Sequence, residues 1–230
     1  MSVRGTVASP NIWQHPQVYE VLNRANDPDG LVDAALRDAR PWDDAVVADV
    51  GCGTGYHLPR YAATARTVVG VEPHAGLATT ARRRCAGLRA VWVRQGTAQA
   101  LPLPDASVDV VHARWAYFFG PGCEPGLAET RRVLRRGGTV AVVDVDSEVG
   151  EYGRWFRAAY PDRDPAVTER FWARQGFTTV HVPTTWRFGS RADLESVLGI
   201  EFPPAVAERA LAEVDGSTIT VGQVVRHRTG

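Results

Sequence analysis

The stretch Val47-Ala48-Asp49-Val50-Gly51-Cys52-Gly53-Thr54-Gly55 decides the fold class of this 230-residue chain. Ala45 to Val50 is a short apolar run, which predicts a buried strand. The alternate glycines after it permit positive φ and let the backbone approach a ligand without an intervening Cβ. Because Leu58 to Ala63 has a helical pattern, the turn is predicted to present its amide groups at the carboxyl end of a strand.

Strand-like and helix-like segments alternate through the rest of the chain. Further strands are expected at 67–71, 90–93, 108–113, 139–145, 177–188 and 218–227, and helices at 16–24, 31–39, 75–86, 126–135, 155–160, 165–175, 193–198 and 203–214. This alternation indicates βαβ units, which place a parallel sheet between two layers of helices. The two late strands are expected at the edge of that sheet, and Asp29 is expected to cap the helix that begins at Leu31.

The composition excludes several classes of protein. Acidic and basic residues number 26 each, which argues against a nucleic-acid or membrane partner. Every basic residue is Arg, so a phosphate-binding loop that ends in Gly-Lys and a Schiff base on Lys are impossible. The three cysteines are scattered and predict neither disulfides nor a metal site. No signal peptide or membrane span is apparent, so we expect a cytoplasmic location.

An acid after the second strand sharpens the interpretation of the glycine turn. Glu72 follows the run Val68-Val69-Gly70-Val71 and lies 21 residues after Gly51, where a carboxylate can accept both ribose hydroxyls of a nucleoside. Asp49, near the end of the first strand, is suited to a cationic group of a ligand. The dinucleotide pattern G-x-G-x-x-G fails because position 56 is Tyr, which disfavours an NAD-dependent oxidoreductase.

Four segments in order, 47–55, 69–73, 96–111 and 132–138, resemble the successive motifs of class I S-adenosylmethionine-dependent methyltransferases. The resemblance is to the ubiquinone/menaquinone-biosynthesis-like branch, methyltransferase type 11, and covers about 45–146. It implies a Rossmann-like, doubly wound α/β fold whose mostly parallel seven-stranded sheet has an antiparallel edge strand. It also implies one domain, with an N-terminal helical lid (1–44), a cofactor-binding core (45–146) and C-terminal helices and edge strands (147–230).

The resemblance implies S-adenosylmethionine as the cofactor and assigns its contacts. The predicted cofactor-binding residues are Asp49, Gly51, Cys52, Gly53, Glu72, Pro73, Thr97, Ala98, Gln99 and Arg114. Asp49, Gly51 and Gly53 are expected to hold the methionine end and Glu72 the ribose. The residues expected around the adenine are Pro73, His74, Thr97, Ala98 and Gln99. Thr97 stands where family members often carry Asp, so Gln99 or a backbone group is expected to share its role.

The acceptor is predicted to lie beyond the fourth strand, beside an aromatic cluster that contains one arginine. The predicted substrate-side residues are Trp13, Tyr19, Trp115 and Tyr117, and the predicted catalytic residues are His15, as a base, and Arg114. Phe118 and Phe119 are equally consistent with core packing and with substrate contact. His57 is equally consistent with lining the cofactor pocket and with pointing to solvent, and His112 is expected to be structural.

The preferred hypothesis is methyl transfer to a small-molecule acceptor by in-line displacement, with no nucleic acid or membrane involved. A methyltransferase can lack a general base, because its main task is to align the nucleophile, the methyl group and sulfur. An RNA or protein methyltransferase and a non-catalytic cofactor-binding protein stay open as alternatives. The arginines at 82–84 and at 131, 132, 135 and 136 are interpreted as solvated helix ends rather than as an RNA groove.

Overall fold

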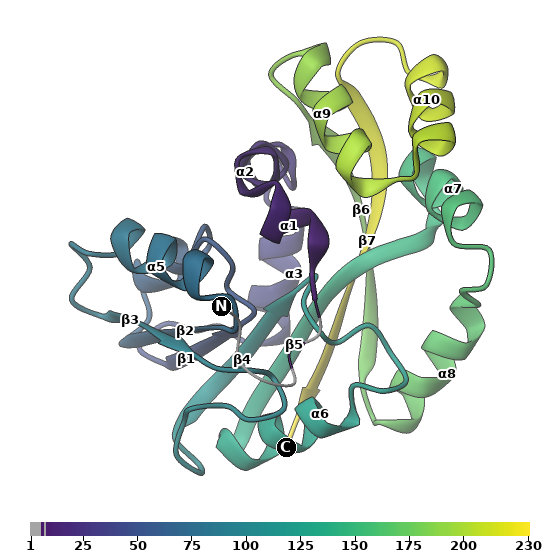
Figure 1. The fold of residues 1–230 in the computed structure, drawn as a ribbon. Coiled ribbons are helices and arrows are strands. Elements are labelled where there is room, and N and C mark those ends of the chain that lie inside the picture. The colour runs from purple at the N-terminus through teal and green to yellow at the C-terminus, as the bar shows by residue number, and fades with distance from the viewer. Residues whose placement is uncertain (1–5, 7) are drawn as a thin grey trace.

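A computed structural model describes residue 6 and residues 8–230, which form one sheet and the helices around it (Figure 1). The helices are α1 (Pro10–Gln14), α2 (Pro16–Ala25), α3 (Leu31–Ala39), α4 (Leu58–Ala62), α5 (Ala75–Arg84), α6 (Glu124–Val133), α7 (Gly150–Ala159), α8 (Pro165–Arg174), α9 (Arg191–Glu201) and α10 (Pro204–Glu213). The strands are β1 (Val46–Val50), β2 (Thr67–Glu72), β3 (Val91–Gln95), β4 (Val108–Arg114), β5 (Leu134–Val149), β6 (Thr178–Arg187) and β7 (Thr218–Thr229).

The sheet has the strand order β3-β2-β1-β4-β5-β7-β6. β1 to β5 pair in parallel, whereas β7 is antiparallel to both of its neighbours, β5 and β6. This confirms the predicted mostly parallel, seven-stranded α/β fold. The reversal of strand order between β1 and β4 brings the carboxyl ends of β1, β2 and β4 together, which is where ligands bind in open α/β sheets.

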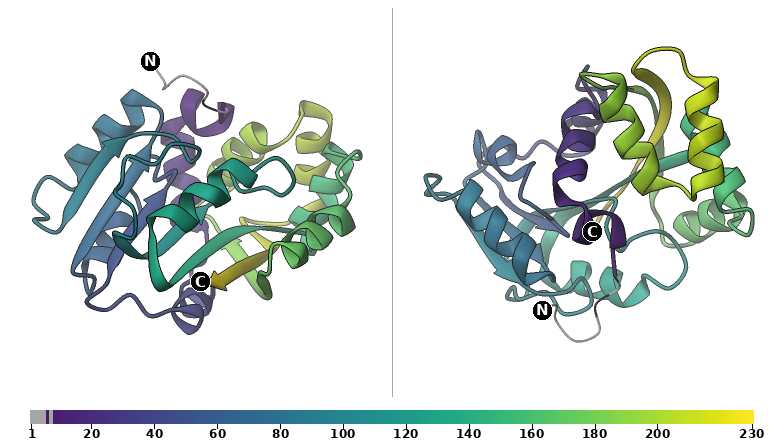
Figure 2. Two further views of the ribbon diagram at one scale, coloured as in Figure 1. Left: turned by 90° about the horizontal axis from the view of Figure 1, so that it is seen from below. Right: turned by 45° about the horizontal axis from the view of Figure 1, so that its top comes forward.

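Alternate residues of the central strands pack on opposite faces of the sheet. Val47 and Val110 face a core formed with α3 and α4, whereas Ala48 and Val111 face a core formed with α6 and α8. Helices therefore cover both faces, as Figure 2 shows. This explains why the parallel strands are continuously apolar in sequence instead of alternating.

A third core lies at the far end of the long β6–β7 ribbon, where α7, α9 and α10 pack (Figure 1). Its centre is aromatic, with Tyr152, Trp186 and Phe202 in ring contact. Leu22 of α2 is buried in the same core, and α2 lies beside α9 in Figure 1 and in the right-hand view of Figure 2. The N-terminal helices are thereby held between this C-terminal unit and the parallel half of the sheet.

The cap of α3 differs from the prediction. Asp29 does not cap this helix; instead, Asp27 accepts hydrogen bonds from the backbone N–H groups of Val32 and Asp33. Gly30 adopts φ +72°, and this left-handed turn directs the start of the helix back towards Asp27. Asp29 is instead paired with an arginine of β6, at 3.5 Å.

Three boundaries also differ from those predicted. Residues 10–14 form α1, which the pattern did not indicate, and α7 begins at Gly150, five residues earlier than expected. The helix expected to reach Arg135 ends at Val133, because Leu134 pairs with Val108 and begins β5. Among the described residues, no helix is both long and apolar enough to cross a membrane, and no group of three His, Cys, Asp or Glu residues could hold a metal ion.

Candidate active site

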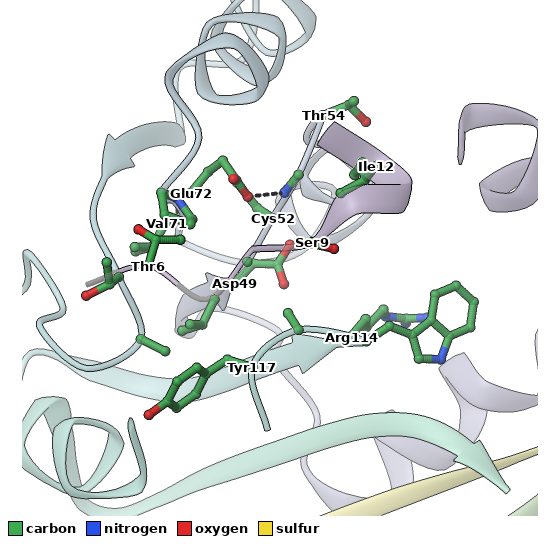
Figure 3. Close-up of a pocket in the computed structure, with 18 of the residues that line it drawn as sticks. Thr6, Ser9, Ile12, Asp49, Cys52, Thr54, Val71, Glu72, Arg114 and Tyr117 are labelled. Atoms are coloured by element: carbon green, nitrogen blue, oxygen red, sulfur yellow. Dashed lines mark hydrogen bonds between the residues drawn. The ribbon is translucent and has the colours of Figure 1, made fainter. Parts of the chain in front are cut away.

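A cleft opens at the carboxyl ends of β1, β2 and β4 and is covered by the N-terminal segment (Figure 3). It has about 1080 Å³ of empty space, including the solvent at its mouth. The glycine turn forms one wall, the end of β4 forms another, and Thr6, Ser9 and Ile12 lie on the N-terminal side. The motif segments that the sequence singled out therefore meet at one place.

The glycine turn is held close to its neighbours on both sides. Gly51 has φ +78°, and a Cβ there would collide with the Cβ of Ala116. Gly53 has φ +56°, and a Cβ there would lie 2.8 Å from Ile12 Cδ1. The backbone N–H groups of Gly51 and Cys52 both donate to the carbonyl of Val71, which ties the turn to β2. Glycine is needed here for its backbone conformation and for the close approach of other chain segments.

Glu72 lies at the end of β2 and is only 4% exposed. One carboxylate oxygen accepts a hydrogen bond from Gly53 N at 2.9 Å, and the other accepts one from His74 N at 2.9 Å. Burial raises the pKa of this carboxyl, although both backbone hydrogen bonds oppose the shift. No ion pair to a described residue engages Glu72, so its oxygens keep lone pairs that can accept hydroxyl groups from the cleft.

Asp49 is 3% exposed at the end of β1 and lines the same cleft. No described residue hydrogen-bonds its carboxylate. Burial raises its pKa to about 7; the positive charge of Arg114 opposes this shift, and the negative charge of Glu72 adds to it. A buried carboxylate without a hydrogen bond is costly, and this cost is relieved when a cationic ligand group occupies the adjacent space.

Arg114, the last residue of β4, lies beside Asp49 with its side chain 7% exposed. Its Nε donates to the hydroxyl of Tyr61 at 3.1 Å, and its Nη2 donates to Asp33 at 3.3 Å. Asp33 of α3 also pairs with Arg60 at 3.2 Å. These contacts fix the guanidinium plane, and Nη1 keeps its hydrogen-bonding capacity because it has no partner among the described residues.

Two histidines near Arg114 are neutral for the same physical reasons. Burial, followed by the positive charges of Arg114 and Arg60, lowers the pKa of His57 well below its usual value. Burial and Arg114 lower the pKa of His112 to about 3. His57 lines the cleft, whereas both ring nitrogens of His112 are buried without a hydrogen bond, against Trp42 and Tyr61. His112 is therefore a core residue, as predicted.

The structure brings together every residue of the predicted cofactor set. The cleft is lined by Asp49, Gly51, Cys52, Gly53, Glu72, Pro73, Thr97, Ala98, Gln99 and Arg114. Thr97 is buried where the chain forms a tight turn, with its carbonyl accepting from Ala100 N at 3.2 Å. The contacts of each residue with a cofactor stay predictions, but their common location is what those predictions require.

The predicted substrate-side aromatic residues also line the cleft, at the end of β4 and on α1 and α2. Trp13, Tyr19, Trp115 and Tyr117 all face it, and the ring of Trp13 lies 5.0 Å from that of His74. Trp115 and Tyr117 have φ of +47° and +55°, a strained backbone for residues other than glycine. Such strain is common at functional sites.

Of the adjacent Phe118 and Phe119, one packs in the core and the other lines the cleft. Phe118 is 1% exposed and packs in the core with Leu127, whereas Phe119 is 42% exposed and lines the cleft. The chain reverses direction there because Phe118 N donates to Ala116 O and Phe119 N donates to Tyr117 O. Only Phe119 is therefore available to a ligand.

His15 is not brought into the cleft. It is exposed between α1 and α2, where its backbone N–H donates to Asn11 O at 2.9 Å. Its side chain is not among those that line the cleft. The prediction that His15 is a base thus lacks support from its position, whereas His57, which was open between pocket and solvent, does line the site.

Some lining residues were missed in the sequence. Asn23 faces the cleft from α2, one turn after Tyr19, and that spacing of four was the available signal. Thr54 of the glycine turn donates to Glu20 of α2, which also pairs with Arg84 at 2.7 Å. Contacts between such distant segments have no signal in a single sequence.

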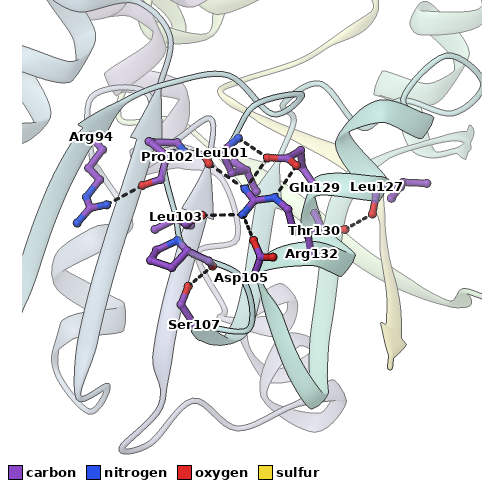
Figure 4. A network of polar contacts seen from close by, with 11 residues as sticks. Arg94, Leu101, Pro102, Leu103, Asp105, Ser107, Leu127, Glu129, Thr130 and Arg132 are labelled. Atoms are coloured by element: carbon purple, nitrogen blue, oxygen red, sulfur yellow. Dashed lines mark hydrogen bonds and ion pairs between the residues drawn. The ribbon is translucent and has the colours of Figure 1, made fainter.

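The interpretation of two arginine groups as solvated helix ends was partly wrong. Arg132 donates to both carboxylate oxygens of Glu129, to Asp105, and to the carbonyls of Leu101 and Leu103 (Figure 4). Arg132 therefore ties α6 to the loop before β4. Arg84 likewise joins α5 to α2 rather than only complementing a helix dipole.

Comparison with known proteins identifies the family. A family model described as a methyltransferase domain matches residues 48–142. The structure of the YcgJ protein from Bacillus subtilis superposes with a TM-score of 0.64 at 14% identity, over 87% of this chain and 98% of that one. Residues 48–142 therefore belong to a methyltransferase domain. Nearly all of the motif series lies within the matched region, whereas β6 and β7 lie outside it. The match leaves no support for the NAD-dependent alternative.

Curated relatives of this methyltransferase have differing descriptions. A probable S-adenosylmethionine-dependent methyltransferase of Mycolicibacterium smegmatis is 40% identical over 138 residues, 59% of this chain and 46% of the relative. A malonyl-[acyl-carrier protein] O-methyltransferase of Pectobacterium atrosepticum is 30% identical over 95 residues, 41% of this chain and 36% of the relative. The first three relatives by similarity are matched over only 32% to 50% of their length. The similarity therefore identifies the domain and leaves the acceptor unassigned.

Proposed function

We propose that this methyltransferase binds S-adenosylmethionine in the cleft and transfers its methyl group to a small-molecule acceptor. The observation that carries the proposal is the buried Asp49 carboxylate, which has no hydrogen bond among the described residues and lies below the glycine turn beside Arg114. The cofactor's amino-acid end is a zwitterion. Its ammonium group complements Asp49, and its carboxylate complements the available Nη1 of Arg114.

Glu72 supports the nucleoside part of the proposal. Hydrogen bonds from Gly53 N and His74 N orient both carboxylate oxygens at the end of β2. In that orientation the remaining lone pairs can accept the two ribose hydroxyls. Pro73, Thr97, Ala98 and Gln99 continue the same wall and would surround the adenine.

The chemistry requires alignment more than acid–base groups. The cofactor supplies a methyl group on a positively charged sulfur. A lone pair of the acceptor forms the new bond to carbon, the carbon–sulfur pair stays on sulfur, and any proton of the acceptor leaves to solvent. Positioning of the reactants can contribute roughly 7–11 kcal/mol to such a reaction. His57 also lines the cleft, but its lowered pKa makes the ring a weak base, so the proposal assigns it no proton transfer.

The N-terminal segment acts as a lid in this proposal. Ser9, Ile12 and Trp13 line the cleft from outside the sheet, and Asn11 of α1 donates to Glu201 of α9 at 2.9 Å. The chain would then form one domain with lid 1–44, core 45–146 and C-terminal part 147–230. The cytoplasmic location stays a prediction.

Calorimetric titration of the whole chain with S-adenosylmethionine, S-adenosylhomocysteine and NAD tests the proposal. We expect saturable binding of the first two compounds and none of NAD, because Tyr56 replaces the glycine that the dinucleotide pattern requires. Binding of NAD without the sulfonium compound would overturn the proposal. Cofactor binding without methyl transfer to any acceptor in a broad panel would favour a non-catalytic role.

A further inference from the structure

Asn23 is a buried polar residue whose side chain faces the cleft without a partner. It is 8% exposed on α2, and no described residue hydrogen-bonds its amide group. Its amide atoms are accessible from the cleft, so they remain available to a ligand. The nearby Asn26, by contrast, accepts a hydrogen bond from Gln223 Nε2 at 2.8 Å. Asn23 therefore differs from its surroundings in lacking a structural partner.

The wall around Asn23 is aromatic and carries no charge of its own. Tyr19 precedes Asn23 by one helical turn, and Trp115, Tyr117 and Phe119 line the cleft from the end of β4. The indole N–H of Trp115 is also buried without a hydrogen bond. The charged groups that line the cleft, Asp49, Glu72 and Arg114, lie at the ends of β1, β2 and β4 and are assigned to the cofactor in the proposed function.

We infer that this wall binds an uncharged, flat acceptor that has a hydrogen-bonding group, with Asn23 as a specificity-determining residue. The inference rests on the proposed function, because the cofactor must occupy the charged part of the cleft. The aromatic side chains would contact the faces of the acceptor. The Asn23 amide both donates and accepts, so it can bind an amide, a hydroxyl or a ring nitrogen. An ionic acceptor would lose its hydration there without gaining an opposite charge.

The stability of an Asn23→Leu variant distinguishes an acceptor-binding role of Asn23 from a structural one. Leucine has a similar size and its introduction breaks no hydrogen bond to a described residue, so the variant is expected to melt at the same temperature as the natural protein or at a higher one. A residue that satisfies a structural hydrogen bond would show the opposite effect. Gln17→Leu is the matched control, because Gln17 is exposed on the same helix and does not line the cleft.

The binding experiment uses three probes of nearly equal shape: neutral benzamide, anionic benzoate and cationic benzamidine. S-adenosylhomocysteine is titrated first, and each probe is then titrated into the saturated complex. We expect benzamide to bind more tightly than either ion, and Asn23→Leu to weaken benzamide roughly three- to tenfold. The control variant should bind benzamide like the natural protein, and S-adenosylhomocysteine should bind all three proteins equally.

Each result supports or overturns a distinct claim. Failure of S-adenosylhomocysteine to bind would contradict the proposed function itself. If it binds but benzamide does not, or if benzoate or benzamidine binds at least as well, the uncharged-acceptor inference is overturned. Unchanged benzamide affinity in Asn23→Leu, or a lower melting temperature with unchanged affinity, would remove Asn23 from the acceptor site.

Discussion

Arg132 on α6 and Asp49 on β1 are both ionisable residues, but their hydrogen-bonding surroundings differ. Arg132 makes five hydrogen bonds to Glu129, Asp105, Leu101 and Leu103 (Figure 4). Asp49 is buried in the cleft and makes none among the described residues (Figure 3). The first network is complete without any ligand, whereas the second charge is satisfied only when a ligand supplies the opposite charge.

The comparison teaches how to separate structural from ligand-binding polar groups in this fold. A satisfied network contributes to stability and has no remaining capacity for a ligand. An unsatisfied buried group lowers stability and is retained where it contributes to function. Substitution of Arg132 should therefore lower the melting temperature without changing cofactor affinity, whereas substitution of Asp49 should raise the melting temperature and weaken cofactor binding.

The largest effect on stability is expected for Arg132→Met. This change leaves the Leu103 carbonyl and Glu129 Oε1 without a donor and removes one of two donors from the Leu101 carbonyl and Glu129 Oε2, at a cost of roughly 2–3 kcal/mol. Chemical denaturation with circular dichroism measures the loss. Titration with S-adenosylmethionine below the transition should show unchanged affinity. A stable variant with weakened binding would contradict the structural role of this network.

A smaller effect of opposite sign is expected for Asp49→Asn. The folded pKa of Asp49 is about 7, above the ordinary value of 3.8. The folded state therefore binds the proton more tightly, and the natural protein loses stability as pH rises from about 4 to about 7. Asn does not titrate, so the variant should be more stable at pH 8, by on the order of 2 kcal/mol, with little difference at pH 4.

Melting curves of both proteins at several pH values measure this difference. The comparison between variant and natural protein cancels the titration of all groups that they share. A difference that does not change between pH 4 and pH 8 would mean that Asp49 titrates normally. A less stable variant at pH 8 would mean that the carboxylate has a structural partner.

The smallest effect is expected for Tyr61→Phe. The buried Tyr61 hydroxyl accepts from Arg114 Nε at 3.1 Å, so its removal loosens the guanidinium without leaving a cavity. S-adenosylmethionine should bind more weakly by about 1 kcal/mol. An analogue of the cofactor that lacks the carboxylate should bind the variant and the natural protein equally. Equal losses for both ligands would show that Tyr61 does not act through Arg114.

Much of the parallel half of the fold could be predicted, because its strands are buried on both faces. The apolar runs that end at Val50 and Val71 and the glycine turn mark strand ends directly. The boundary between α6 and β5 was missed because Leu134 continues the helical pattern, and only its pairing with Val108 makes it a strand residue. The cap of α3 was missed because Gly30 changes the chain direction.

The candidate site was predictable to the extent that its residues belong to motifs. Asp49, Glu72 and Thr97 follow strands or turns whose positions the sequence indicates. The spacing of Asn23 from Tyr19 indicated its side of the helix, but its lack of a partner is visible only in three dimensions. His15 was selected for its chemistry and its place in the predicted lid, and the structure places it on the surface.

The most direct test of the central claim is calorimetric titration of the natural protein and Asp49→Asn with S-adenosylmethionine at pH 5.5 and pH 7.5. Asp49 must be ionised to bind the ammonium group, so the affinity of the natural protein should rise with pH across this range. The variant should bind roughly 10- to 100-fold more weakly at pH 7.5 and change little with pH. Equal affinities with the same pH dependence would contradict the claim that Asp49 holds the cofactor.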